Sequence, residues 1–254
     1  MNQPRHVLLI GASSDIGGAL AAELQTAGIV VSGAGRTLPT STVFPHFFPI
    51  LYQNLSWPDL LARISREVGT PIDAVAFLPG VASFGATADI PITEAREIFE
   101  VNFWLLSQAA LGCASYWREQ KIPGTFVGLL SIAALRAIPD ESYYAASKSA
   151  ALRFLETLDL EYAADGQSFR AACPGLFASK FRKTSTNHNI SAPDLAATSL
   201  EHVAHAVKEL LFHERQNRVI GWRENVIALA DRVSPHIYNF AMLRGRLSKR
   251  PRTP

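Results

Sequence analysis

Tyr144 and Lys148 stand four residues apart in the segment "SYYAASK", residues 142–148. On a helix, side chains at this spacing are neighbours. A nearby ammonium group stabilises phenolate over phenol, so the pKa of Tyr144 would fall from its reference value of ~10. Such a tyrosine can give a proton to a developing alkoxide or take one from an alcohol. The alternative is an ordinary exposed helix surface, which is the commoner meaning of this spacing alone.

The elements around this pair favour chemistry. The apolar run 125–130 predicts a strand that ends at Ser131, and the helix that carries Tyr144 follows it. In a parallel sheet the carboxyl ends of the strands meet at one edge, where α/β proteins bind their ligands. The Ser131 hydroxyl could therefore bind a carbonyl oxygen close to the Tyr144 phenol.

A glycine turn is predicted at the same edge. The first predicted strand, 6–10, runs directly into "GASSDIGG". Free backbone N–H groups and the positive end of a helix dipole attract a phosphate at such a turn. The candidate phosphate-binding residues are Gly11, Ser13, Ser14, Asp15, Ile16 and Gly17. The alternative is a plain strand–turn–helix connection, because a short glycine motif is a weak signal.

The end of the second predicted strand indicates which dinucleotide would bind. An NAD site usually places an Asp or Glu about 20 residues beyond the glycines, where it binds the ribose. This chain has Gly35 and Arg36 there, and no acid. A guanidinium pairs with a 2′-phosphate that a carboxylate would repel. The sequence therefore predicts NADP(H), with NAD(H) possible; the alternative is a solvated arginine.

Short apolar runs alternate with helical patterns along the chain. Strands are predicted at 6–10, 29–34, 47–52, 74–78, 125–130, 169–174 and 218–222, and helices at 15–27, 57–68, 92–120, 142–164 and 195–213. This alternation is typical of a doubly wound parallel sheet with helices on both faces. Pro49 weakens the third strand. We predict a single Rossmann-type α/β domain over 1–254, with 176–198 as a substrate-side loop and 222–254 as a C-terminal extension.

Composition narrows the class of protein. The chain has 254 residues, 48% of them hydrophobic, and a net charge of +2, which indicates no nucleic-acid partner. Two distant cysteines, Cys113 and Cys173, favour a reducing compartment over a disulfide framework. We find no secretory signal and no apolar run approaching the ~20 residues that span a bilayer. We therefore expect a cytoplasmic protein.

Taken together, these motifs resemble the classical short-chain dehydrogenase/reductase family. The resemblance covers about residues 5–221 and is carried by "GASSDIG", "FLPG" (77–80), "VN" (101–102), Ser131, "YAASK" and "PG" (174–175). Ser131 precedes Tyr144 by thirteen residues, as in that family. The resemblance implies that Tyr144 is the general acid/base and that Lys148 lowers its pKa and holds the nicotinamide ribose. It implies that Ser131 orients the substrate carbonyl and that Asn102 supports a water in the proton relay.

The resemblance extends the candidate cofactor site beyond the glycine turn. It adds Arg36, Gly80, Tyr144, Lys148, Pro174 and Gly175, with Asn54 in place of the usual acid near adenine and Ser179 in place of the usual threonine near the nicotinamide amide. The chain also departs from the family pattern. Ile10 replaces a threonine, Asp15 replaces the middle glycine, and "FLPG" replaces "NNAG". Tyr143 matches no family role, so we assign it to packing or to the substrate side.

By resemblance, the protein would transfer a hydride between nicotinamide and a carbonyl or secondary alcohol. Five residues would rim the pocket in this fold and favour an apolar small molecule: Phe84, Leu135, Ile138, Phe177 and Phe181. The alternatives are a lyase or epimerase on the same scaffold, or a non-catalytic nucleotide-binding or scaffold protein. In this family, equivalents of the helices 92–120 and 142–164 pair across a two-fold axis, so we expect a homodimer or homotetramer.

For two further features of the sequence we prefer an interpretation without a ligand or a membrane. His202 and His205 are three residues apart and could touch one metal, but we expect a solvated helix face and no metal site. The tail 226–247 has apolar residues at helical spacing and then a basic end. It could pack on its own domain, on a partner subunit or on an anionic membrane surface, and we favour packing on protein.

Overall fold

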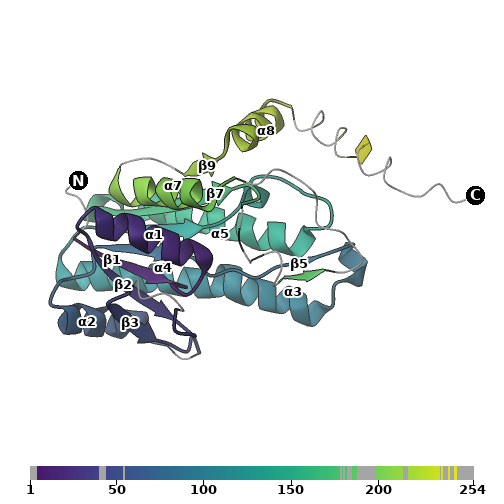
Figure 1. The fold of residues 1–254 in the computed structure, drawn as a ribbon. Helices are drawn as coiled ribbons and strands as arrows, with labels where there is room; N and C mark the ends of the chain where they lie inside the picture. The colour runs from purple at the N-terminus through teal and green to yellow at the C-terminus, as the bar shows by residue number, and fades with distance from the viewer. Residues whose placement is uncertain are drawn as a thin grey trace, which may run out of the picture.

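A single parallel sheet of seven strands forms the centre of the computed structural model (Figure 1). The structure describes residues 5–39, 44–53, 55–177, 179, 181, 185–187, 198–213, 217–234, 236, 240 and 243–244. The strand order is β3-β2-β1-β4-β6-β7-β9, and every pairing is parallel. The strands are β1 His6–Ile10, β2 Val30–Gly35, β3 His46–Pro49, β4 Ala74–Phe77, β6 Gly124–Leu129, β7 Gln167–Pro174 and β9 Arg218–Ile220. The predicted doubly wound α/β fold is confirmed.

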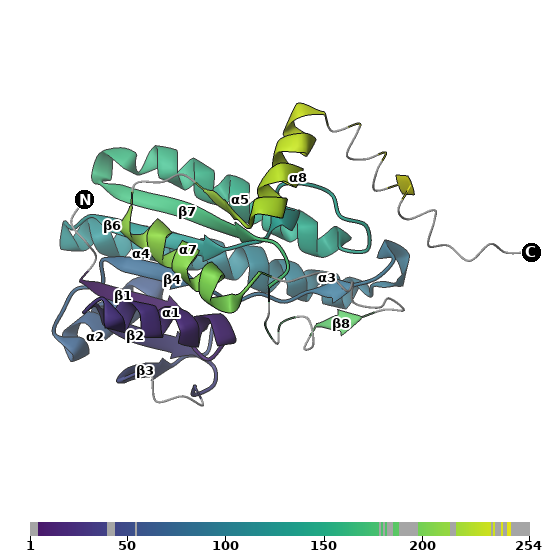
Figure 2. The same cartoon turned by 45° about the horizontal axis from the view of Figure 1, so that its top comes forward.

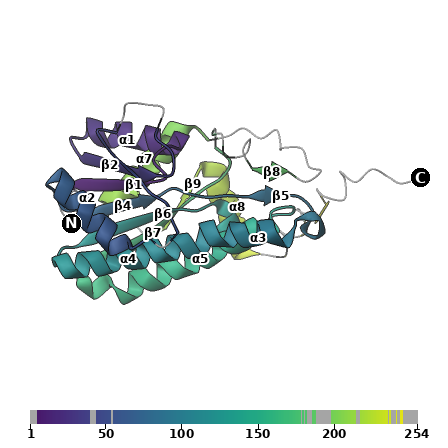
Figure 3. The ribbon, with the colours of Figure 1, turned by 90° about the horizontal axis from the view of Figure 1, so that it is seen from below.

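Helices cover both faces of the sheet (Figure 3). On one face lie α1 Asp15–Thr26 and α7 Leu200–Phe212; on the other lie α2 Trp57–Val68, α4 Leu106–Gln120 and α5 Ser142–Glu161. Successive residues of a strand point to opposite faces. Leu8 and Ile10 accordingly pack on the second group of helices, while Val7 and Leu9 pack on the first. Burial on both faces explains the unbroken apolar sequence of the central strands.

The third strand lies at an edge of the sheet, which explains its proline. The strand ends at Pro49 rather than continuing to Tyr52 as predicted. Among the described strands β3 is the outermost, and it pairs with β2 alone. A proline is tolerated on an edge strand, where its missing N–H interrupts no inner hydrogen-bond ladder.

The long helical pattern 92–120 is not one α-helix. It divides into α3 Ile92–Phe99, a π-helical segment η2 Glu100–Leu105, and α4. A π turn holds an extra residue, which changes the direction of the side chains that follow. Asn102 lies inside this segment and is fully buried. The prediction of one continuous helix was therefore wrong at the position of a candidate site residue.

Two residues of the substrate-side loop belong to a second, two-stranded sheet. Thr186–Asn187 (β8) pairs in parallel with Ser83–Phe84 (β5), which follows β4. A bridge also joins Phe177 to Thr198. The loop after β7 is thus joined by backbone pairing to the segment after β4.

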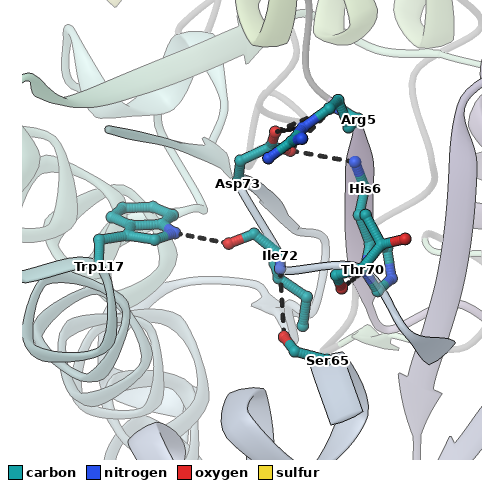
Figure 4. A network of polar contacts seen from close by, with 7 residues as sticks. All are labelled: Arg5, His6, Ser65, Thr70, Ile72, Asp73 and Trp117. Atoms are coloured by element: carbon teal, nitrogen blue, oxygen red, sulfur yellow. Dashed lines mark hydrogen bonds and ion pairs between the residues drawn. The ribbon is translucent and has the colours of Figure 1, made fainter. Parts of the chain in front are cut away.

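Polar contacts also join segments at the amino ends of the strands, at the end of the sheet opposite the glycine turn (Figure 4). Both oxygens of the Asp73 carboxylate accept from the backbone N–H of Arg5 at 3.0 Å, and Oδ1 also accepts from His6 N–H at 3.0 Å. Close by, the indole N–H of Trp117 donates to the carbonyl of Ile72 at 3.0 Å. These bonds hold β1, the start of β4 and α4 in register, far along the strands from the candidate site.

We expect Asp73→Ala to lower the free energy of unfolding by about 2–3 kcal/mol, because it leaves two backbone N–H groups without their charged acceptor. The midpoint of thermal unfolding should fall by about 4–10 °C. Urea and thermal unfolding check this, with the exposed Asp165→Ala as the matched control. Unchanged unfolding of the Asp73 variant would contradict the role given to this carboxylate.

The C-terminal extension begins with a helix that stands away from the body of the protein (Figures 1 and 2). This helix, α8, spans Trp222–Val233 and carries several exposed apolar residues. The described part of the tail therefore does not bury its apolar stripe on its own domain, one of the arrangements that the sequence left open. Within the described residues, no helix is both long and apolar enough to cross a membrane.

Candidate active site

The glycine turn after β1 has the backbone shape that the sequence predicted. Gly11 has a φ of +80°, and its N–H donates to the carbonyl of Ala34 at 2.8 Å. A Cβ at Gly11 would lie 3.1 Å from the ring of Pro79, the third residue of "FLPG". Both the left-handed backbone and this close approach require glycine. The altered "FLPG" segment thus packs directly against the glycine turn.

The turn leads into α1 through a capping serine. Ser14 Oγ accepts from Gly17 N–H at 3.1 Å and donates to the Gly11 carbonyl at 2.8 Å. A Cβ at Gly17 would lie 2.6 Å from the Ala12 carbonyl oxygen, so only glycine lets the helix start this close to the turn. Asp15 lies in the first helical turn, where a carboxylate complements the helix dipole, and Ile16 is buried. The predicted phosphate-binding residues lie together.

Hydroxyl groups gather where the second strand ends. Arg36 and Ser13 are exposed, and Thr37 Oγ1 donates to Ser13 Oγ at 3.1 Å. Gly35 leaves room here, since a Cβ on it would only reach ordinary contact with Ser13 Oγ at 4.0 Å. Burial raises the pKa of Tyr52, and the Arg36 guanidinium opposes that shift, which places the Arg36 charge near this ring. Sequence reasoning missed Thr37, although its hydroxyl stands next to Arg36 in the chain.

Lys148 and Tyr144 come together on α5 as their spacing predicted. The Lys148 side chain is 3% exposed, and its Nζ donates to the Leu129 carbonyl at 3.0 Å. Nζ lies 5.9 Å from the centre of the Tyr144 ring, and a Cβ at Gly80 would lie 3.3 Å from Nζ. Burial lowers the pKa of Lys148 to about 8. An ammonium group is thus buried beside a phenol, at the sheet edge that carries the glycine turn.

The Tyr144 ring is 7% exposed and is flanked by two aromatic residues. Phe84 lies edge-on at 6.1 Å between ring centres, and Phe181 lies at 6.0 Å. Ile138 packs on the same cluster. Two other expected rim residues lie elsewhere: Leu135 packs on the main core, and Phe177 packs on the cluster beneath α1 and α7.

Asn102 braces the backbone on which this site is built. Its Nδ2 donates to the Val81 carbonyl at 2.9 Å and to Ser147 Oγ at 3.0 Å, while its Oδ1 accepts from Val81 N–H at 3.0 Å. Ser147 Oγ in turn donates to the Tyr144 carbonyl at 2.8 Å. Asn102 therefore connects the segment after β4 to the turn of α5 that bears Tyr144. Sequence reasoning missed Ser147, whose position three residues after Tyr144 was the available signal.

Ser131 lies two residues after β6, and among the described residues its hydroxyl is seen only as an acceptor. Its Oγ accepts from Ala133 N–H at 3.1 Å and caps a short 3₁₀ helix, η3 Ile132–Ala134. A hydroxyl has one proton to donate in addition to its lone pairs. Ala133 belongs to the same buried cluster as Tyr144. The proposed carbonyl-binding role of Ser131 stays a prediction, and its position near the Tyr144 cluster is compatible with it.

The remaining predicted cofactor residues follow β7. Pro174 ends this strand after Cys173, a buried core residue whose pKa burial raises to about 12. A Cβ at Gly175 would lie 2.1 Å from Oε1 of Glu224, so the Glu224 side chain of α8 lies directly against this segment. Ser179 is partly buried in the following loop. Asn54 lies outside the described residues.

The histidine pair on α7 takes part in surface contacts. His205 Nδ1 lies 3.4 Å from Glu23 Oε2 on α1, and Lys208 Nζ lies 3.6 Å from the same oxygen. The backbone N–H of His202 donates to Ser199 Oγ, which caps the helix. In the part of the chain that the structure describes, His, Cys, Asp and Glu side chains form no group of three or more that could hold a metal ion.

Comparison with known proteins agrees with this geometry. The profile of the family described as short chain dehydrogenase matches residues 50–190, more than half of the chain. A short chain dehydrogenase from Burkholderia cenocepacia, solved in complex with NADP, has a TM-score of 0.75 at 20% identity, covering 95% of this chain and 98% of that one. A short chain dehydrogenase from Leptospira borgpetersenii with bound NAD⁺ has a TM-score of 0.72 at 18% identity, covering 86% and 91%.

A curated relative, the ketoacyl reductase HetN of a Nostoc species, is 24% identical over 184 residues, 72% of this chain. The chain spans about 60% of the length of the first curated relatives it matches. The family profile, the fold of the solved structures and the Ser131, Tyr144 and Lys148 motif agree with one another. The chain therefore belongs to the short chain dehydrogenase family of oxidoreductases.

Proposed function

We propose that the protein is an NADP(H)-preferring oxidoreductase that acts on a carbonyl or secondary alcohol of an apolar small molecule. One observation carries this proposal: Lys148 is buried beside Tyr144, next to Gly80, at the edge of the sheet that carries the glycine turn. Burying an ammonium group is costly, and perturbed charges of this kind concentrate at functional sites. A purely structural helix would be more stable with an apolar residue at position 148.

The residues present fit a nicotinamide dinucleotide. The glycine turn brings backbone N–H groups to the start of α1, and Gly11 and Gly17 allow the close packing described above. We propose that Gly11, Ser13, Ser14, Asp15, Ile16 and Gly17 hold the pyrophosphate, and that Gly80, Pro174, Gly175, Ser179 and Asn54 line the rest of the site. When bound, the cofactor supplies or accepts the hydride.

The proton chemistry belongs to the protein. In the reducing direction, the Tyr144 O–H gives its proton to the carbonyl oxygen as negative charge develops there, and in the oxidising direction the phenolate takes it back. The Lys148 ammonium favours the phenolate form and would hold the nicotinamide ribose. Ser131 donates a hydrogen bond to the same carbonyl oxygen. We propose that Asn102 supports a water in the proton relay, as well as bracing Val81 and Ser147.

The substrate class follows from what surrounds the phenol. Phe84, Phe181 and Ile138 enclose the Tyr144 ring with apolar surface. Apolar walls around one polar group favour a ligand that is mostly hydrocarbon with a single reactive oxygen. We therefore infer a small apolar ketone or secondary alcohol.

Two other functions make different predictions for the same experiment. A lyase or epimerase on this scaffold would bind cofactor without net oxidation of it, and a non-catalytic nucleotide-binding protein would bind it without any turnover. Titration with NADPH, followed by a panel of apolar ketones in which loss of nicotinamide absorbance is recorded, separates the three. We expect both binding and turnover. Binding without turnover across the panel would count against the oxidoreductase.

We expect NADPH to bind at least ~10-fold more tightly than NADH, a difference of ~1.4 kcal/mol, within the range of a charge-assisted contact. Arg36, with Ser13 and Thr37 beside it, would face the 2′-phosphate. Arg36→Ala should remove most of the preference, whereas Arg66→Ala, an exposed arginine on α2, should not. Titration by nicotinamide fluorescence measures both. Equal affinity in the unmodified protein would rule out the assignment.

We also expect a homodimer or homotetramer in solution. Large apolar residues are exposed on η2, α4 and α5: Trp104, Leu111 and Leu160. An isologous contact between two copies of α4 and α5 would cover apolar residues of this kind. Light scattering at micromolar concentration checks this, and Leu111→Glu should weaken the assembly. A monomer under those conditions would contradict the prediction.

A further inference from the structure

The helix α8 presents an apolar stripe to solvent. Trp222, Val226, Leu229 and Val233 are each between 58% and 77% exposed. Their spacing of four, three and four residues places all of them on one face of a helix. Single apolar residues scattered over a surface are normal, whereas a contiguous exposed apolar stripe marks a surface that binds a protein or a membrane.

Contacts from the first turn of α8 hold the helix to β9 and to two nearby glycines. Asn225 Nδ2 donates to the carbonyls of Val219 at 3.1 Å and Gly221 at 2.7 Å. The Glu224 carboxylate lies so close to the backbone of Gly175 and Gly221 that a Cβ on either glycine would clash with it. Glu224 lies across the helix from the apolar stripe. The helix itself stands away from the sheet (Figure 2), and the four side chains of the stripe are exposed.

Charge is unevenly distributed between the tail and the rest of the chain. Arg244, Arg246, Lys249, Arg250 and Arg252 are five of the 24 basic residues, and residues 236–254 contain no acid. The other 19 basic residues stand against 22 acidic residues, so the chain before Arg244 has a net charge of −3. The basic cluster is thus confined to the sequence that follows the apolar stripe.

Cations also accompany the exposed aromatic rings of this region. The Arg223 guanidinium lies 5.4 Å from the centre of the Trp222 ring. Further along, Phe240 and Leu243 are exposed, and the Arg244 guanidinium lies 4.7 Å from the Phe240 ring. Aromatic rings with adjacent cations are characteristic of the boundary between lipid headgroups and acyl chains.

We propose that α8 and the basic tail bind the surface of an anionic lipid bilayer. The stripe would enter the boundary between headgroups and acyl chains, and the five cations would contact anionic headgroups. A second copy of the chain is a poorer occupant, since its own C-terminal sequence carries the same five cations and no acid. An anionic bilayer neutralises those charges and accepts the apolar stripe at once.

The test uses the full-length protein and sedimentation with vesicles of phosphatidylcholine alone or of phosphatidylcholine and phosphatidylserine at about 3:1. We expect at least ~10-fold tighter binding to the anionic vesicles, weakened by high salt. Leu229→Glu should lower that binding at least ~10-fold, because it puts a charge in the stripe. Replacing the five basic tail residues with glutamine should lower it by a similar factor.

The control is Leu51→Glu, which places the same charge on an exposed leucine outside the stripe and should bind vesicles as the unmodified protein does. Circular dichroism verifies that each variant is folded. Absence of binding by the unmodified protein, or equal binding by the folded Leu229→Glu variant, would overturn the proposal. So would equal binding after neutralisation of the tail. If Leu229→Glu instead dissociates an oligomer in light scattering and no vesicle binding occurs, the stripe is an interface between copies.

Discussion

Tyr144→Phe is expected to lower kcat at least ~100-fold while leaving cofactor binding in place. General acid–base catalysis typically contributes 10²–10⁴-fold, and this substitution removes the transferable proton with little change in volume. The ring sits between Phe84 and Phe181, and a phenylalanine can keep those contacts. The folded state should therefore survive, so the loss of rate can be assigned to the missing proton.

Tyr143→Phe is the matched control for that experiment. Tyr143 is adjacent in sequence but partly exposed, whereas Tyr144 is buried beside Lys148. Neighbouring residues on a helix face different directions, so the control should change kcat by less than ~10-fold. The comparison needs one ketone or alcohol that is turned over, assayed across pH. A Tyr144→Phe enzyme with near-normal kcat would exclude the proposed mechanism.

Lys148→Met is expected to reduce activity as strongly as Tyr144→Phe and to weaken cofactor binding, yet to stabilise the folded protein. The activity falls because the phenol loses its neighbouring charge and the cofactor loses a ribose contact. The stability rises because burial lowers the pKa of Lys148 from 10.5 to about 8. At ~1.4 kcal/mol per pKa unit, keeping this ammonium buried costs roughly 3 kcal/mol. Lys148→Met also loses the hydrogen bond to the Leu129 carbonyl, which stabilises the fold by about 1 kcal/mol. The net increase in the free energy of unfolding is therefore about 2 kcal/mol.

The stabilisation by Lys148→Met is expected to decrease as the pH rises. The folded-state pKa lies below the unfolded value, so the unfolded chain binds more protons at Lys148 between about pH 8 and pH 10.5. The stabilisation by Lys148→Met should be full below pH 8 and disappear as the pH rises toward 10.5. Urea unfolding at several pH values measures it, with the exposed Lys121→Met as control. A less stable methionine variant at neutral pH would show that Lys148 supports the fold.

The local features of the site could be predicted because neighbours along the chain determine them. The turn at Gly11, the cap at Ser14 and the four-residue spacing of Tyr144 and Lys148 all depend on residues within one or two helical turns. The apolar strands were also recognisable, because strands buried on both faces carry unbroken apolar runs. The sequence also predicts that Pro49 weakens the third strand. That this strand lies at the edge of the sheet, where a proline is tolerated, follows only from the strand order.

Contacts between distant segments could not be predicted in the same way. The π-helical turn around Asn102 has the same apolar periodicity as an α-helix over a few residues, so the sequence pattern did not distinguish them. The bonds of Asn102 to Val81 and Ser147, and of Thr37 to Ser13, join residues more than twenty positions apart. Phe84, Phe177 and Phe181 are chemically alike, and only the path of the loop after β7 separates the two that flank Tyr144 from the one that does not.

The same limit applies to α8. The spacing of Trp222, Val226, Leu229 and Val233 predicts that one helix face is apolar. Whether that face is buried depends on which side of the helix the domain holds. In the tertiary structure Asn225 binds the carbonyls of Val219 and Gly221, and Glu224, on the side of the helix opposite the stripe, lies against Gly175 and Gly221. The apolar face remains exposed.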